Sequence, residues 1–177
     1  MRSPILFGAL ALAVAGCAET NDPTEFEPIV VPVFTQTVAD DATLFRTHAR
    51  GSGEVPGNDS RAQGQTIFAL SEDGTELHYK LIVANIENVL MSHIHVAPAG
   101  VNGGIVVWLY PSAPPASLIP GRTDGILAEG VITDADVVGS LAGTGIAGLL
   151  AEIRAENTYV NVHTSQFPPG EIRGQIH

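Results

Sequence analysis

Short segments in which apolar and polar side chains alternate, separated by turn signals, fill the chain from about residue 43 onward. The clearest pair spans residues 67–70 and 77–83, with the turn Ser71–Thr75 between them. Asp73 and Gly74 in this turn readily adopt the positive φ angles that a tight hairpin needs. The same signals predict further strands over residues 90–96, 105–110, 126–132, 158–164 and 172–176. This spacing is typical of an all-β sandwich.

Three stretches depart from the strand pattern. Residues Thr133–Asp136 have the form of a capping box, with Asp136 in place of the usual Glu. Residues 148–155 have the apolar spacing of a helix. Both predict short helices in a crossover between strands. Residues 111–124, which contain four prolines, predict a surface loop.

Three histidines on two of the predicted strands are the strongest candidates for chemistry. His93 and His95 are two residues apart, so both side chains leave the same face of an extended strand. His163 alternates in the same way with Val162 on its own strand. If the two strands are neighbours, three neutral imidazoles can converge on a copper or zinc ion.

The pattern does not fix a fourth ligand. Glu171 is the first choice, with His78, His48 and water as alternatives. Two other interpretations stay open: the histidines form a structural polar network with loop carbonyls, or they line a pocket for a ligand other than a metal. The His-x-His strand is similar to that of the copper-zinc superoxide dismutases, and this analogy suggests metal storage or superoxide chemistry as the activity of a metal site.

Other polar and aromatic residues favour structural roles. Glu171 and Arg173 lie on one face of the last predicted strand, which is typical of a solvated ion pair worth well under about 1 kcal/mol. Trp108 and Tyr110 are expected in the core rather than in a sugar-binding platform, and Tyr159 in the core with a bonded hydroxyl. The sequence contains no nucleophile elbow and no phosphate loop, so a hydrolase nucleophile is not indicated and enzyme activity is the less favoured interpretation.

The N-terminus predicts export. The apolar run from Ile5 to Ala15 has about half the length of a membrane-spanning helix, so residues 1–16 are interpreted as a cleaved signal peptide. Ala15 and Gly16 before Cys17 resemble the bacterial lipoprotein box, which implies cleavage before Cys17 and its acylation. The alternative is an ordinary signal peptide followed by a coincidental cysteine. Ala18 provides no aspartate-type retention signal, so we expect the outer membrane, with the protein facing the periplasm or the cell surface.

Composition separates a tether from a folded domain. Residues 17–42 are rich in proline and acid, which favours an extended tether, although residues 29–34 can also be interpreted as an edge strand. Residues 43–177 are long enough for one sizeable core. Cys17 is the only cysteine, so no disulfide can form within the chain and packing must provide the stability.

The charge of the chain limits its partners. The formal net charge is -11, and removal of residues 1–16, which contain Arg2 and no acid, makes it about -12. Lys80 is the only lysine and the arginines are scattered, so we expect no nucleic-acid binding. The negative field repels anionic headgroups, and membrane attachment therefore depends on the lipid. The same field raises the local concentration of cations.

The domain resembles the CHRD domain, a module named from chordin and frequent in exported bacterial proteins. The matching blocks are residues 53–56, 62–64, 73–75, 77–79, 85–86, 93–95, 100–103, 132–136, 159–164, 167–168 and 170–176. The chain departs from the pattern at Gly57, where a second proline is common, and in the proline-rich insert after Tyr110. The resemblance implies a Greek-key β-sandwich of the superoxide-dismutase or immunoglobulin type. It also implies a binding or structural module without established catalysis, whose partner is an envelope or extracellular protein or glycan.

Overall fold

The computed structural model describes residues 43–177, and within them the fold is all-β, as predicted. The signal peptide, Cys17, the tether and the alternative edge strand at residues 29–34 lie outside the described residues. The seven strands are β1 (Leu44–Arg50), β2 (Gln63–Leu70), β3 (Leu77–Val96), β4 (Gly104–Tyr110), β5 (Ile119–Ile132), β6 (Thr158–Thr164) and β7 (Ile172–Gln175). The helical elements are α1 (Gly145–Arg154) and the 3-10 turns η1 (Gly51–Gly53), η2 (Asp134–Asp136) and η3 (Gly139–Leu141). The Greek-key sandwich stays a prediction.

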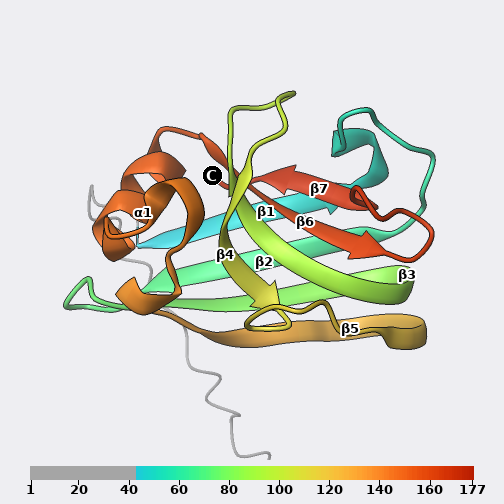
Figure 1. Cartoon of the computed structure of the whole chain (residues 1–177), viewed down its shortest axis with the longest axis horizontal. Coiled ribbons are helices and arrows are strands. Elements are labelled where there is room, and N and C mark those ends of the chain that lie inside the picture. Colours follow the sequence, from blue (N-terminus) through green and yellow to red (C-terminus); the bar gives the residue numbers. More distant parts are fainter. Residues whose placement is uncertain (1–42) are drawn as a thin grey trace, which may run out of the picture. The chain divides into compact units, whose positions relative to one another are not determined.

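Strand β3 organises the fold because it pairs with four other strands (Figure 1). Its first half pairs with β2 on one side and β5 on the other, and its second half pairs with β4 and β6. Asn85 and Asn88 have positive φ angles of 60° and 54°, near the point where the partners change. Asparagine adopts this left-handed conformation more readily than most residues, so it is suited to redirecting the strand there.

The pairings form a closed, barrel-like circuit. Strands β1, β2, β3, β6 and β7 pair in turn, and β7 returns to β1. The closure is short: Arg50 pairs with Arg173, and beyond it Arg46 and His177 exchange backbone hydrogen bonds of 2.8 and 2.9 Å. Strand β5 pairs only with β3 among the described strands, so its outer edge is free.

Alternating side chains fill the inside of the circuit. Ile94 of β3 and Val160 of β6 belong to one apolar cluster, which also includes Ile146 and Leu149 of α1. Val162 of β6 belongs to a second cluster with apolar residues of β1, β3 and β7 and with Ala62, which directly precedes β2. Helix α1 therefore buries its apolar face on one end of the domain (Figure 1). No helix among residues 43–177 is long and apolar enough to cross a membrane.

Most predicted elements are present, with shifted ends. Residues 158–164 form β6 as predicted, and the two segments predicted at 77–83 and 90–96 form parts of one strand, β3. The prediction of a loop over residues 111–124 is wrong for its last part, because β5 begins at Ile119 and pairs there with Val89. The capping box is confirmed, with Asp136 accepting from the Thr133 backbone, and the predicted helix spans residues 145–154.

Closure of the circuit requires a glycine at position 174. A Cβ there would overlap the carbonyl oxygen of His48 and Oγ1 of Thr47 on β1. We therefore expect Gly174→Ala to lower the free energy of unfolding by about 1–3 kcal/mol. Gly104→Ala is the control, because a Cβ at that strand glycine meets nothing within 4 Å, and its effect should stay below about 0.5 kcal/mol. Urea unfolding measures both, and equal effects would contradict the close approach of β1 and β7.

Candidate metal centre

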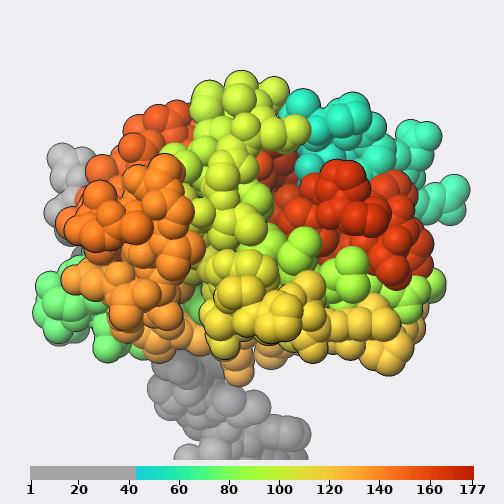
Figure 2. Space-filling model, viewed as in Figure 1, coloured from blue at the N-terminus to red at the C-terminus, as the bar shows by residue number. Residues whose placement is uncertain are grey.

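A polar face of the second half of β3, β6 and β7 carries the candidate site. On β6, Val160 and Val162 point into the core, so Tyr159, Asn161 and His163 point outward. These three outward residues are nevertheless buried. Two loops cover them: the residues after β1, 51–62, and the residues after β3, 97–103, which flank the red C-terminal segment in Figure 2.

The structure brings the three predicted histidines together. The pairing of β3 with β6 places Met91 opposite His163 and His93 opposite Asn161, so the outward side chains of the two strands adjoin. One ring nitrogen of each of His93, His95 and His163 lies within 4.8 Å of the others. The closest pair is Nδ1 of His93 and Nε2 of His163, at 3.3 Å.

Backbone carbonyls fix the protonation of two rings. Nδ1 of His95 lies 3.0 Å from the carbonyl oxygen of Gly103, and Nδ1 of His163 lies 2.9 Å from that of Pro168. A carbonyl oxygen only accepts hydrogen bonds, so both Nδ1 atoms carry the proton and both Nε2 atoms present a lone pair. Metal-binding histidines are oriented in this way by a backbone carbonyl or a carboxylate behind the ring.

Burial keeps the imidazoles neutral. Burial, reinforced by the neighbouring His163 and His95 rings, lowers the pKa of His93 to about 3. Burial also lowers the pKa of His95 and of His163, although the backbone carbonyls at Gly103 and Pro168 oppose the shift. Neutral imidazole is the form that coordinates a metal, so all three rings are ready to do so near neutral pH.

The separation of the closest nitrogens suits a tetrahedral ion. Two nitrogens that are each about 2.0–2.1 Å from a tetrahedral metal are about 3.3–3.4 Å apart. The distance of 3.3 Å between His93 and His163 matches this value. An ion at this position would replace the hydrogen that lies between the two nitrogens, and Nδ1 of His93 would bind it. The proton of the His93 ring would then reside on Nε2, which forms no hydrogen bond. The largest separation in the cluster, up to 4.8 Å, requires one ring to move inward.

The other residues considered as ligands lie apart from the cluster. The Glu171 carboxylate accepts hydrogen bonds from Ser60 Oγ and Thr164 Oγ1, each 2.6 Å long. His78 is exposed and lies 3.5 Å from Glu76, and His48 is exposed on β1. None of the three joins the imidazoles.

The prediction that Glu171 and Arg173 form a solvated ion pair is wrong. They are only 6% and 2% exposed, because the two loops cover this face of β7. Arg173 donates to the carbonyl oxygens of Val101 and Pro98 and to Oδ1 of Asn102, so it holds the 97–103 loop in place.

The Arg173 guanidinium also connects this loop to the histidines. It lies 3.4 Å from the centre of the Tyr159 ring. The same ring stacks on His95, with a centroid distance of 4.8 Å and an interplanar angle of 5°. Tyr159 is buried with its hydroxyl bonded to the Gly103 backbone N–H, as predicted. Trp108, predicted in the core, is half-buried and packs edge-on against His93 at 4.3 Å.

Two polar residues beside the histidines were not predicted as candidate ligands: Glu54, and Asn161, which the strand alternation places on the face of His163. Burial raises the pKa of Glu54 to about 7, against the opposing attraction of Arg173 and hydrogen bonding from the Val55 backbone and Asn161. Glu54 Oε1, Asn161 Oδ1 and His95 Nε2 are buried and form no hydrogen bond. Each such atom costs about 1–3 kcal/mol when it is left without a partner. The signals in the sequence were that Glu54 and Asn161 belong to the family-like blocks 53–56 and 159–164, and that Asn161 shares a strand face with His163.

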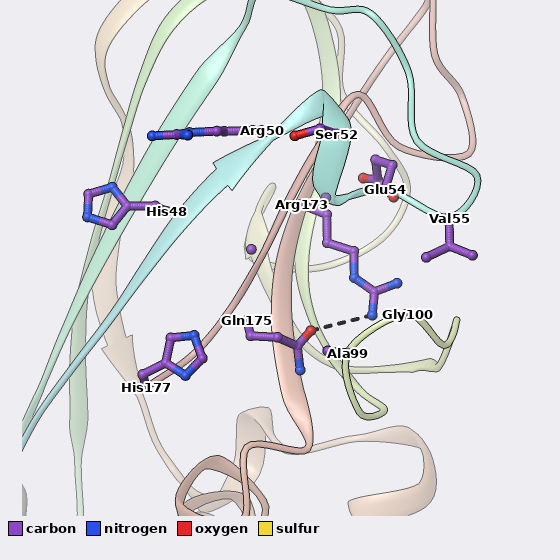
Figure 3. Close-up of a pocket in the computed structure, with 12 residues that line it drawn as sticks. His48, Arg50, Ser52, Glu54, Val55, Ala99, Gly100, Arg173, Gln175 and His177 are labelled. Carbon is purple, nitrogen blue, oxygen red and sulfur yellow. Dashed lines mark hydrogen bonds between the residues drawn. The ribbon is translucent and has the colours of Figure 1, made fainter.

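A pocket of about 800 Å³ lies on the far side of Arg173 (Figure 3). Arg173 and Gln175 extend into it from β7, and Glu54 lies beside Arg173. The lining residues are His48, Arg50, Ser52, Gly53, Glu54, Val55, Ala99, Gly100, Arg173, Gly174, Gln175 and His177. The three imidazoles are not part of this lining, so the pocket and the histidine cluster are separate features.

The barrel-like circuit and its buried polar face define an all-β module whose side chains are suited to binding. The chain belongs to the CHRD domain family, whose model matches residues 45–176. CHRD domains are binding or structural modules of uncertain role, without established catalysis. Searches of the curated proteins and of the solved structures found no match.

The contacts of Arg173 predict a large effect on stability. Arg173→Leu removes charged hydrogen bonds to the 97–103 loop and the contact with Tyr159, so we expect the free energy of unfolding to fall by about 2–4 kcal/mol. Arg122→Leu is the control: Arg122 pairs with Asp124 at 2.6 Å but is exposed, and its loss should cost less than about 1 kcal/mol. Urea unfolding compares the two, and a loss at Arg173 as small as at Arg122 would contradict its structural role.

Proposed function

We propose that the domain binds one copper or zinc ion through His93, His95 and His163. The observation that carries this proposal is the convergence of three neutral imidazoles, two of them oriented by backbone carbonyls so that a nitrogen lone pair remains for an ion. Imidazole suits both metals. Strands β3 and β6 are rigid supports, which favours a site that exists before the ion arrives.

The unpartnered His95 nitrogen favours a metal over a purely structural network. In a structural network, buried polar atoms normally find hydrogen-bond partners. Nε2 of His95 has none, and its Nδ1 is already used by Gly103. A bound ion satisfies this lone pair once the ring nitrogens, now up to 4.8 Å apart, close around it.

We also propose where the domain acts. The signal-like residues 1–16 and Cys17 support an exported, lipid-anchored protein of the cell envelope, in which residues 17–42 connect the lipid to the domain. The outer membrane, facing the periplasm or the cell surface, is the proposed location. An envelope or extracellular protein or glycan is the proposed partner class, and the Greek-key β-sandwich is the proposed fold type. The acidic charge of -11 supports the metal proposal, since it concentrates cations near the domain.

Metal storage and superoxide chemistry are the two activities that such an ion suggests. Redox turnover needs an open coordination position for the substrate, whereas storage does not. A superoxide dismutation assay of the copper-loaded protein distinguishes the two, because only redox turnover consumes superoxide.

Metal binding is measured on the chain carrying Cys17→Ser, which removes the only thiol. Trp108 is the only tryptophan and contacts His93, so Cu²⁺ should quench its fluorescence and saturate near one equivalent. His95→Gln and His163→Gln should each weaken binding by at least about 100-fold, more than the loss typical of an outer-shell partner. Elemental analysis after dialysis gives the stoichiometry independently.

His78→Gln is the matched control, because His78 is exposed and lies apart from the cluster. It should bind copper and zinc as the parent chain does. Quenching that survives in His95→Gln and His163→Gln, or no binding by the parent chain, would overturn the metal site.

The anchor is tested by fractionation. Cys17→Ser in the otherwise natural chain should move the protein from the membrane fraction to the soluble fraction, because the thioether-linked lipid can no longer form. Ser3→Ala, a change in the same N-terminal segment that leaves Cys17 intact, is the control. Unchanged partitioning of Cys17→Ser would contradict the lipid anchor.

A further inference from the structure

Two buried acceptors stand side by side at the edge of the histidine cluster. Asn161 Oδ1 and His95 Nε2 form no hydrogen bond, and His95 Nε2 presents a lone pair because Nδ1 donates to Gly103. The Asn161 side chain is close enough to affect the pKa of His95, which burial lowers and both the Gly103 carbonyl and Asn161 raise in part. Neither atom can donate to the other, so both need an outside partner, and a metal ion is one that suits both.

The sheet register directs Asn161 to the same point as the histidines. Asn161 pairs directly with His93 across β3 and β6, and it lies two residues from His163 on the same face of β6. The residue is 3% exposed, so its oxygen has no access to bulk water. Asn161 is therefore a buried oxygen-bearing residue on the same face as the three imidazoles.

Glu54 lies close to the Asn161 side chain. Burial raises the pKa of Glu54, and hydrogen bonding from the Asn161 side chain opposes this rise. A donor on this side has to be the Nδ2 group, which leaves Oδ1 directed away from Glu54. Gly170 fixes the carboxylate from behind, since a Cβ at Gly170 would overlap Glu54 Oε1.

We propose that Oδ1 of Asn161 is the fourth ligand of the ion and that Glu54 is its positioning residue. This inference rests on the proposed function and completes the three imidazoles to a set of three nitrogens and one oxygen. An amide oxygen is a hard, neutral donor, so the set is suited to Zn²⁺ or Cu²⁺ rather than to Cu⁺, which prefers soft sulfur ligands. A filled fourth position favours storage or structural binding over redox turnover.

The test uses the full chain with Cys17→Ser and measures Zn²⁺ affinity by competition with a chromophoric chelator. Asn161→Leu should bind Zn²⁺ at least about tenfold more weakly, because it keeps the size of the side chain and removes the oxygen. Asn161→Asp should keep the affinity or increase it, because it retains an oxygen at the same position. Glu54→Leu should weaken binding by a smaller factor than Asn161→Leu, and Glu54→Gln should restore part of that loss.

Thr158→Val is the matched control. Thr158 lies on the same strand, is buried, and has a hydroxyl oxygen without a hydrogen bond, but it points to the opposite face. This variant should bind Zn²⁺ like the parent chain. Circular dichroism and urea unfolding of each metal-free variant confirm that it is folded before its affinity is compared.

Cobalt provides a readout that a structural asparagine would not change. In the parent chain Asn161 occupies the fourth coordination position of Co²⁺, so the Co²⁺ absorption spectrum should stay constant between about pH 6 and 9. In Asn161→Leu a water molecule takes the fourth coordination position. Metal-bound water loses a proton at about pH 7, so the Co²⁺ spectrum of this variant should become pH-dependent.

The outcomes separate this inference from the proposed function. If the parent chain and Asn161→Leu bind Zn²⁺ equally well and give the same pH-independent Co²⁺ spectrum, Asn161 is not a ligand, although the three-histidine site remains. If the parent chain binds neither Zn²⁺ nor Co²⁺, both proposals are overturned.

Discussion

The pairing of β3 with β6 is the constraint on which the rest of the site depends. It aligns His93 with Asn161 and Met91 with His163, so residues about 70 positions apart in sequence become lateral neighbours. A shift of this pairing by one residue would turn Val160 and Val162 outward and the histidine inward. Since those valines belong to the two apolar clusters, the core itself enforces the register that gathers the imidazoles.

The outward face of these strands is unusual because it is both polar and buried. Arg173 makes this possible: its guanidinium satisfies carbonyls of the 97–103 loop and covers Tyr159, which in turn covers His95. The loop then supplies the Gly103 carbonyl that orients His95. One side chain of β7 thus connects loop, aromatic ring and imidazole, and the candidate site is part of the architecture of the domain.

Strand alternation was sufficient to predict the all-β class, β6 and a shared face for His93 and His95, because a period of two places these two residues on one face in any register. The approach of His163 depends on the pairing of β3 with β6, which alternation does not give. Alternation also could not show that this face is covered, since burial by loops is a tertiary property without a period. Glu171 and Arg173 were therefore placed in solvent, and Glu54 and Asn161 were not considered as ligands. Strand β1 was also not predicted. Its buried residues Phe45, Thr47 and Ala49 include a polar threonine and a small alanine, so their alternation with the exposed Arg46, His48 and Arg50 gives a weak apolar pattern.

The free outer edge of β5 bears on how closely many copies can be packed together. An uninterrupted edge strand invites a second chain to add to the sheet. In β5 the pairing with β3 is irregular at three places, Gly121 and Gly125 have positive φ angles, and Arg122 and Asp124 place charges between them. These interruptions leave no long, flat stretch of β5 backbone with which a second chain could pair. Ile126, although 56% exposed, therefore sits on a rim that resists lateral aggregation at high surface density.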